Sequence, residues 1–175
     1  MEYEIKDCTE KHLPEILSIF NDAILNSTAL YDYKIRTLDM MHIWYTEKKV
    51  ANSPIIGIFD FENTLMGFAT YGQFRVRPAY KYTVEHSVYI RFDKRGMGFG
   101  KILLQNIIAK AEEQNFHVMV GVIDTSNSVS IKLHENEGFE LCGIMKQVGY
   151  KFGQWLDAAF YQLILNTPKQ PEDDK

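Results

Sequence analysis

The N-terminal part of the chain shows two spacings of apolar positions, one typical of a strand and one typical of a helix. Residues 3–8, YEIKDC, predict a first strand. The next segment has apolar residues three or four positions apart, which predicts an amphipathic helix with Thr9 as a candidate N-cap and Pro14 in its first turn. The apolar stripe of this helix comprises Leu13, Ile16, Ile19, Phe20 and Ile24.

The rest of the chain alternates between the same two patterns. A second helix is expected near residues 37–50, with Thr37 or Asp39 as its cap. Six more strands are expected at residues 54–60, 65–74, 82–90, 117–123, 139–150 and 155–165. Two more helices are expected at about residues 98–114 and at 125–138, and Gly138 ends the second of these.

The predicted order of elements is therefore β-α-α-β-β-β-α-β-α-β-β. The strand–helix–strand–helix run after residue 82 favours a parallel strand pair, and the hairpins favour antiparallel neighbours. We expect a single α/β domain over residues 1–166, with a mixed, mostly antiparallel sheet of about seven strands and about four helices. Residues 167–175 are polar and contain prolines, which predicts a disordered tail.

Composition limits the classes of function. The chain is 46% apolar and 24% charged, and its formal net charge of −4 argues against a general nucleic-acid binder. It has no apolar run of the roughly 18 residues that a membrane span needs, and its acidic N-terminus is unlike a secretion signal. Cys8 and Cys142 are too few for a disulfide framework, and no His/Cys cluster indicates a metal. We expect a cytoplasmic protein with reduced cysteines and no metal.

The most distinctive motif is the glycine-rich stretch RGMGFGK, residues 95–101, which runs directly into a predicted helix. Glycines let backbone N–H groups approach an anion at a helix N-terminus, where the helix dipole also favours negative charge. Spacing excludes a Walker A loop, because Arg95 stands at its first glycine and Ile102 at its Ser or Thr. The dinucleotide fingerprint fails as well, because its third glycine would fall on Lys101 or Leu103. An anion-binding loop and an ordinary glycine-rich turn remain as alternatives.

The pattern that survives is R-x-x-G-x-G, formed by Arg95, Gly98 and Gly100, and it resembles the pyrophosphate-binding motif of the GNAT superfamily of N-acetyltransferases. The stretch NSVSIKLHENEGF, residues 127–139, is similar to the second motif of that family. The segments STALYDYKIRT, TVEHSVYI, LHENEGFE and VGYKFGQWLD resemble the phosphinothricin and methionine-sulfoximine acetyltransferases. The resemblance covers about residues 1–165. It implies a GNAT fold with a splayed parallel strand pair, transfer of acetyl from acetyl-CoA to the α-amine of a small amino acid analogue, and a homodimer.

The resemblance also implies an acetyl-CoA site on the glycine loop and on the strand before it. Backbone groups of the strand would face the pantetheine arm, the loop would hold the pyrophosphate, and Asn127 would hold the pantetheine region. Lys132 is a candidate for a phosphate contact, although a solvated helix lysine is equally expected. The implied cofactor-binding residues are Val88, Tyr89, Ile90, Arg95, Gly96, Met97, Gly98, Phe99, Gly100, Lys101, Asn127 and Lys132.

Two residues are candidates for the proton transfers. An α-ammonium group must lose a proton before it attacks a thioester, and the departing thiolate, with a pKa of about 8.5 if it behaves like a simple thiol, benefits from gaining one. Glu85 lies mid-strand among apolar residues, where a charge is costly without a task or a partner, and the resemblance implies that it is the base, directly or through a water. A solvated carboxylate, or one paired with Arg75 or Arg77, is the alternative. The resemblance implies His134 as the acid, where most GNATs have Tyr, and a hydrogen-bond donor near sulfur or a helix-surface histidine are its alternatives.

Substrate recognition is expected on two neighbouring segments. Arg75 and Arg77 face the same way if their segment is extended, and guanidinium groups suit carboxylate and phosphinyl oxygens, although a solvated edge is the alternative. Strand alternation places Glu85 and Ser87 on one face and His86 on the other, so His86 is expected to be structural or at the substrate rim. The predicted substrate-binding residues are Arg75, Val76, Arg77, Glu85, His86 and Ser87.

Two other functions stay open at this point. An enzyme of the same class could acetylate a polyamine or a protein N-terminus, although the arginine pair disfavours a polyamine because like charges repel. A non-catalytic acetyl-CoA-binding module would need the glycine loop but neither Glu85 nor His134.

Overall fold

The computed structural model describes residues 2–173, which group into two compact units. The first unit contains the chain up to Thr70 together with Ser87–Leu104, and the second contains Tyr71–His86 together with the chain from Gln105 onward. Within residues 2–173, seven strands pair in the order β1-β2-β3-β4-β5-β7-β6. The elements that pass from one unit into the other are β3 (Leu65–Gln73), β4 (Thr83–Ile90) and α3 (Phe99–Glu113).

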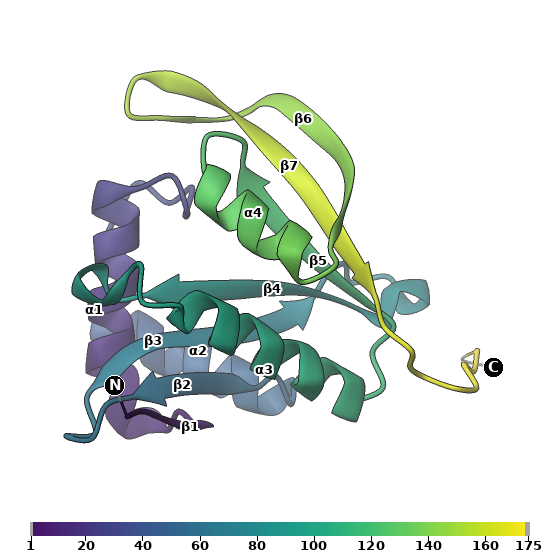
Figure 1. Cartoon of the computed structure of the whole chain (residues 1–175), viewed down its shortest axis with the longest axis horizontal. Helices are drawn as coiled ribbons and strands as arrows, with labels where there is room; N and C mark the ends of the chain where they lie inside the picture. The colour runs from purple at the N-terminus through teal and green to yellow at the C-terminus, as the bar shows by residue number, and fades with distance from the viewer. Residues whose placement is uncertain (1, 174–175) are drawn as a thin grey trace. The chain divides into compact units, whose positions relative to one another are not determined.

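The first unit is an antiparallel meander with two helices. Its further elements are β1 (Glu4–Asp7), α1 (Leu13–Asn26), α2 (Leu38–Val50) and β2 (Ile55–Phe59). Strand β2 pairs with β1 on one side and with β3 on the other, and the arrows of β2 and β3 point in opposite directions in Figure 1. Thr37 caps α2, because its side-chain oxygen accepts a hydrogen bond from the Met40 N–H at 3.3 Å.

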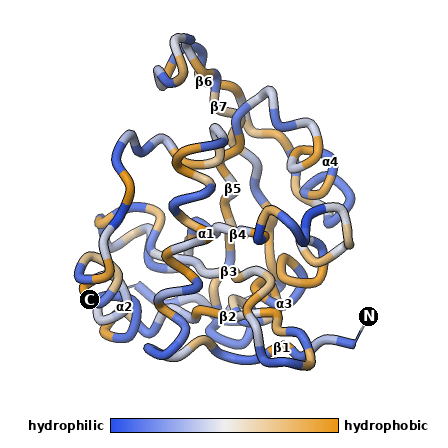
Figure 2. The backbone as a smooth tube through the Cα atoms, turned by 90° about the vertical axis from the view of Figure 1, so that its left-hand side faces the viewer, coloured by the Kyte–Doolittle hydropathy of each residue, from blue (hydrophilic) through white to orange (hydrophobic). Residues whose placement is uncertain are grey.

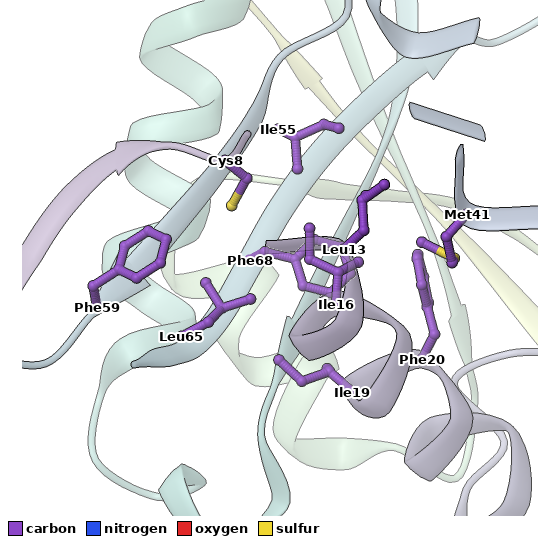
Figure 3. Close-up of a cluster of buried hydrophobic side chains, with 10 residues drawn as sticks. All are labelled: Cys8, Leu13, Ile16, Ile19, Phe20, Met41, Ile55, Phe59, Leu65 and Phe68. Carbon is purple, nitrogen blue, oxygen red and sulfur yellow. The ribbon is translucent and has the colours of Figure 1, made fainter. Parts of the chain in front are cut away.

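The apolar stripe predicted for α1 forms the core of this unit. Its five residues are buried, which confirms the helical spacing: Leu13, Ile16, Ile19, Phe20 and Ile24. Figure 3 shows Leu13, Ile16 and Phe20 of α1 gathered with Phe68 of β3 and Met41 of α2. The ring of Phe68 lies 5.0 Å from the ring of Phe20 in an edge-to-face arrangement, which adds a directional contact to the burial of apolar area.

The described residues of the second unit contain the C-terminal part of the sheet, most of α3 and one further α-helix. Its further elements are β5 (Val118–Asp124), α4 (Ser128–Asn136), β6 (Glu140–Lys151) and β7 (Gln154–Ile164). The hairpin of β6 and β7 turns at Phe152 and Gly153, whose φ angles of 52° and 76° fit a two-residue type I′ turn. Apolar residues, orange in Figure 2, occur along both strands of this long hairpin.

The parallel pair that the sequence predicts is β4 with β5. Thr83–Glu85 pair with Val118–Val120, so the parallel ladder comprises three residue pairs and ends at Glu85 and Val120. On its other side β5 pairs antiparallel with β7 along its whole length, from Val118 to Asp124. The α/β class, the order of elements and the mixed seven-stranded sheet are confirmed.

Some local features differ from the pattern-based boundaries. A 3-10 helix at Glu10–His12 precedes α1, and others lie at Pro78–Tyr80 and Phe92–Lys94. Strand β3 ends at Gln73, so Arg75 and Arg77 lie in an irregular segment between that strand and a 3-10 helix. No helix within residues 2–173 is long and apolar enough to cross a membrane.

The chain after β7 makes several contacts within the second unit. Thr167 donates from its hydroxyl to the Phe116 carbonyl at 2.5 Å. The backbone N–H of Glu172 donates to the Tyr82 hydroxyl at 3.0 Å. Residues 174 and 175 of the predicted tail lie outside the described residues. The domain boundary at residue 166 stays a prediction.

Candidate active site

Strand β4 carries two chemically different side chains on opposite faces of the sheet. Burial alternates along it, with Val84 and His86 buried and Glu85 half-buried. Glu85 is registered with Val120, whereas His86 meets the imidazole of His134 near Gly121 of β5. Because side chains of a strand alternate between faces, Glu85 lies on one face of the sheet and the two imidazoles lie on the other.

Glu85 is a half-buried carboxyl with a cation in its surroundings. Partial burial raises its pKa above the ordinary value, and the nearby charge of Arg75 acts in the opposite direction. Desolvation is the larger influence, so the carboxyl holds its proton more strongly than a solvated glutamate does. A carboxylate of raised pKa is a stronger base, which suits a group that must take a proton from an amine.

The segment after β3 brings the two predicted arginines into the same unit as Glu85. The Arg75 guanidinium lies over the ring of Phe74 at 4.2 Å, and its Nη1 donates to the Phe74 carbonyl at 2.9 Å. Arg77 directly precedes the 3-10 helix at Pro78–Tyr80, and Val76 between the two arginines exposes 87% of its surface. Both guanidinium groups are exposed, so an anionic group can reach them without their leaving a buried ion pair.

His86 and His134 form a buried pair of imidazoles. Their rings stack with centroids 5.0 Å apart and an angle of 20° between the ring planes, and their Nε2 atoms are 3.1 Å apart. His134 Nδ1 donates to the Ser130 carbonyl at 2.7 Å. Burial lowers the pKa of His86 to about 3, with the His134 ring as a second cause, and burial also lowers the pKa of His134. Neither ring carries a charge at neutral pH.

Helix α4 begins at the second predicted motif. Asn127 is the N-cap, because its side-chain oxygen accepts a hydrogen bond from the Ser130 N–H at 3.0 Å. This contact leaves the amide NH₂ as the part of Asn127 that a ligand contact would use. Lys132 is exposed on the same helix, whereas His134 exposes only 4% of its surface, which excludes the helix-surface histidine among the alternatives.

The glycine loop lies in the first unit and leads into α3. Gly96 and Gly98 have φ angles of 77° and 83°, in the left-handed region that glycine adopts without strain. Apart from the glycine and its two chain neighbours, no heavy atom of the described residues lies within 4 Å of the position that a Cβ would take at Gly96 or Gly98. The loop therefore presents open backbone at the start of α3, where the helix dipole favours an anion. The N–H groups of Lys101 and Ile102 in the first turn donate to the Gly98 carbonyl at 3.1 and 3.3 Å.

Arg95 at the start of the loop is already engaged by protein groups. Its Nη2 donates to the Asp22 carboxylate of α1 at 2.7 Å, and its Nε donates to the Ile90 carbonyl at the end of β4 at 3.3 Å. Tyr89 of β4 packs its ring against Phe20, with centroids 5.1 Å apart. The resemblance implies Arg95 as a cofactor-binding residue, and in the structure its guanidinium links the loop to α1 and to the end of β4.

Sequence reasoning missed three residues that take part in these arrangements. Asp22 pairs with an arginine 73 positions away, and no local pattern points to it. Ser130 contributes a backbone carbonyl, which no side-chain pattern can indicate. Gly121 interrupts an apolar strand, and a glycine inside a strand often marks a close approach of another group, so it was the one detectable signal.

The sequence of the chain matches a known protein family and known enzymes. Residues 5–160 match the family model of the acetyltransferase (GNAT) domain. The chain is 43% identical over 169 residues to the L-methionine sulfoximine/L-methionine sulfone acetyltransferase of Pseudomonas aeruginosa, covering 97% of this chain and 98% of that protein.

Two solved structures are closely similar. A candidate acetyltransferase of Acinetobacter baylyi has a TM-score of 0.97 and 54% identity, covering 99% of this chain and 97% of that one. A GNAT superfamily phosphinothricin acetyltransferase of Sinorhizobium meliloti, solved in complex with acetyl-CoA, has a TM-score of 0.94 and 31% identity, covering 99% and 95%. Together these proteins share the fold along nearly the whole chain.

Proposed function

The chain belongs to the acetyltransferase (GNAT) domain family, and on this premise we propose that it transfers acetyl from acetyl-CoA to the α-amine of small amino acid analogues. Methionine sulfoximine, methionine sulfone and phosphinothricin are the proposed acceptors, because relatives that are similar along nearly their whole length carry these names. The reaction is a direct attack of the amine nitrogen on the thioester carbonyl. The amine loses a proton, the carbon–sulfur bond breaks, and CoA leaves as a thiolate that is then protonated.

The observation that carries this proposal is the half-buried Glu85 on β4. We assign it the role of general base, which removes the proton from the acceptor ammonium directly or through a water. The raised pKa supports this role, because a more basic carboxylate takes the proton of an ammonium group at a smaller energetic cost. Its surroundings hold Arg75, so the base remains able to ionise despite its partial burial.

The exposed guanidinium groups of Arg75 and Arg77 are proposed to bind the acid groups of the acceptor. A guanidinium presents paired N–H donors that match carboxylate and phosphinyl oxygens. Arg75 is held over the Phe74 ring, which limits the orientations of its donors. We propose Val76, His86 and Ser87 as their neighbours in the substrate-binding segments, and the buried position of His86 is the weakest match to that role.

The glycine loop is proposed to hold the pyrophosphate of acetyl-CoA. The fit rests on the open backbone at Gly96 and Gly98 and on the helix N-terminus that follows them. We assign the backbone of Met97, Phe99 and Gly100 and the side-chain charge of Lys101 to the same contact. The backbone of Val88, Tyr89 and Ile90 and the side chains of Asn127 and Lys132 are proposed for the rest of the cofactor. Arg95 is proposed to act on the loop rather than on the phosphates, because Asp22 neutralises it.

We propose that His134 is a second residue of the site, near the departing thiolate. The sequence left two roles for it, a proton donor and a hydrogen-bonding group. The lowered pKa favours an uncharged imidazole, which is a poor acid at neutral pH.

Release of CoA tests the reaction and its substrates. Purified protein with acetyl-CoA is expected to release thiol with methionine sulfone, methionine sulfoximine or phosphinothricin, and to release little with spermidine. Glu85→Gln is expected to lower kcat about 100-fold or more, which is the usual contribution of a positioned base. Glu112→Gln, an exposed glutamate of α3, is the matched control and should retain full activity. Tight CoA binding without turnover on any amine would instead favour an acetyl-CoA-binding module.

We further propose that the protein is a homodimer that pairs through the β6 edge. Strand β6 ends the sheet, and five of its apolar residues each expose 44–51% of their surface: Leu141, Ile144, Met145, Val148 and Tyr150. A long apolar edge strand needs a partner, and a second copy of the chain brings the same complementary strand. Light scattering after size-exclusion chromatography should give twice the chain mass. Ile144→Lys with Met145→Lys should give a monomer, whereas Ile43→Lys on the exposed face of α2 should not.

A cytoplasmic location is proposed as well. It is supported by the two cysteines, Cys8 and Cys142, which are both free thiols. Fractionation of the cells that produce the protein, followed by detection in the cytoplasmic fraction, is the direct check.

A further inference from the structure

The hydrogens of the buried imidazole pair can be assigned from its contacts. His134 Nδ1 lies 2.7 Å from the Ser130 carbonyl oxygen. A carbonyl oxygen only accepts hydrogen bonds, so Nδ1 of His134 carries a hydrogen. A neutral imidazole has one N–H, which leaves Nε2 of His134 as an acceptor. The group 3.1 Å from that acceptor is His86 Nε2, which therefore carries the hydrogen of the second bond.

A second observation agrees with this assignment. If His86 is neutral and protonated at Nε2, its Nδ1 is bare. His86 Nδ1 is buried and has no hydrogen-bond partner among residues 2–173. A buried nitrogen without a partner is better tolerated as a bare acceptor than as an unsatisfied donor N–H, since missing donors are the rarer case in proteins. The two hydrogen bonds therefore run in one direction: His86 donates to His134, and His134 donates to Ser130.

Gly121 of β5 provides the space for the pair. A Cβ at this position would lie 3.0 Å from His86 Nε2 and 3.2 Å from both Cδ2 and Nε2 of His134. The φ angle of Gly121 is not in the left-handed region, so its backbone conformation does not require glycine. The lack of a side chain is what leaves room for the two rings. Any side chain here would press on the atoms that join the two rings.

Phe139 is an apolar neighbour of the pair, and the acidic residue next to His134 in the sequence is bonded elsewhere. The Phe139 ring meets both imidazoles edge to face, with centroids 5.5 Å from His86 and 5.0 Å from His134. Glu135, the next residue of α4, accepts a hydrogen bond from the Tyr161 hydroxyl of β7 at 3.1 Å. The described contacts of the pair therefore supply no carboxylate that would stabilise a charged imidazole.

We propose that His86 is a positioning residue for His134. It holds His134 as a neutral ring that carries its hydrogen on Nδ1 and accepts a hydrogen bond from His86 at Nε2. His134 is therefore not the acid that protonates the departing thiolate. This inference rests on the proposed acetyltransferase function and narrows the role of His134 within it. The only N–H of His134 is bonded to Ser130, and its one lone pair is bonded to His86. The ring contributes a fixed, uncharged surface at its position.

Nitrogen NMR of the protein with ¹⁵N-labelled histidine rings tests the assignment without any turnover. We expect His134 protonated at Nδ1 and His86 protonated at Nε2, and the pKa of each ring should lie below the ordinary histidine value of about 6.5. A His134 ring that is protonated at Nε2, or whose pKa lies above that value, overturns the proposal. This readout stands even if the acceptor substrate has been assigned wrongly.

Kinetics of His86 variants test the positioning role. His86→Phe keeps an aromatic ring in the stack but removes the donor, and we expect a lower kcat together with a changed His134 ring signal. His86→Gln restores an N–H near the Nε2 position and should recover part of both. Phe139→Leu is the control, because it alters packing against both rings and leaves their hydrogen bonds in place. A wild-type kcat and an unchanged His134 signal in His86→Phe would show that His86 does not position the ring.

The pH profile of His134→Asn separates the two roles of that residue. If His134 only holds a position, the variant loses less than about tenfold in kcat and the alkaline side of the profile keeps its shape. Loss of an alkaline limb, with a fall of about 100-fold or more, would identify His134 as the acid and sink the proposal. Wild type and Glu85→Gln are measured in parallel. A wild type that releases no CoA with any acceptor would refute the proposed function, while the NMR result would still decide the pair.

Discussion

Arg95 of the glycine loop donates to the Asp22 carboxylate of α1 at 2.7 Å, and this contact joins residues 73 positions apart. Asn26 donates to the other oxygen of the same carboxylate at 2.9 Å, and Arg95 also donates to the Ile90 carbonyl. The loop is thereby tied both to a helix and to the end of β4. A carboxylate would repel a phosphate, so Asp22 acts on the loop and not on a ligand.

Asp22→Ala should therefore weaken the grip on acetyl-CoA without affecting the chemistry. We expect KM for acetyl-CoA to rise about two- to fivefold with kcat unchanged, which corresponds to the energy of an exposed ion pair. Steady-state kinetics with varied acetyl-CoA measure the effect, and Glu47→Ala on the exposed face of α2 is the control. A fall in kcat at unchanged KM would assign Asp22 to the reaction itself.

Gly98→Ala should disturb the loop through its backbone. The φ angle of 83° places this residue in the left-handed region, where a residue with a Cβ costs about 1–2 kcal/mol. We expect a lower free energy of unfolding in urea and a higher KM for acetyl-CoA. Gly143→Ala in β6 is the matched control, because its Cβ would also meet open space and its φ is not positive. Equal effects of the two substitutions would argue against a strained loop.

The raised pKa of Glu85 has a consequence for stability as well as for activity. The unfolded chain releases this proton near pH 4.3, whereas the folded protein retains it to higher pH, so the folded state binds more protons in that window. The group therefore destabilises the fold as pH rises through the window. Glu85→Gln should match wild type in unfolding free energy at about pH 4 and be the more stable of the two at about pH 7.

The same titration predicts an acid limb in the activity of the wild type. kcat/KM should fall as pH decreases through the raised pKa, because a protonated carboxyl cannot act as a base. Glu85→Gln should show only residual activity without that limb. Retention of the limb in this variant would assign the titration to another group.

Two leucines of α1 allow the contribution of core packing to stability to be distinguished from that of helix propensity. Leu13 is fully buried and Leu25 exposes 56% of its surface, although both belong to the same helix. Leu13→Ala should lower the free energy of unfolding by about 2–5 kcal/mol, because it removes buried methyl groups and leaves a cavity. Leu25→Ala should change it by less than about 0.5 kcal/mol. Urea unfolding monitored by circular dichroism measures both, and similar losses would contradict the assignment of the core.

Local regularity made several features of this protein predictable from its sequence. The apolar spacing in α1 predicted which of its residues are buried, because helical periodicity places every third or fourth residue on one face. The alternation along β4 predicted that Glu85 and His86 face opposite ways, because a strand has a period of two. The spacing of Gly96, Gly98 and Gly100 distinguished the loop from a Walker A loop and from the dinucleotide fingerprint. Each of these features depends on residues close together in the chain.

Contacts between distant segments were decided only by the tertiary structure. His86 and His134 are 48 positions apart, and their pairing depends on how α4 packs over β5 and on the space left by Gly121. The sequence assigned His134 a role by resemblance, but the partners of its two nitrogens determine whether it has a proton to donate. The partner of Arg95 was likewise decided by the tertiary structure, because Arg95 forms an ion pair with Asp22. Residue type and periodicity therefore determined the helices and strands and the candidate catalytic and binding residues. The protonation state of His134 and the partner of Arg95 depend on three-dimensional packing, which the spacing of residues along the chain does not reveal.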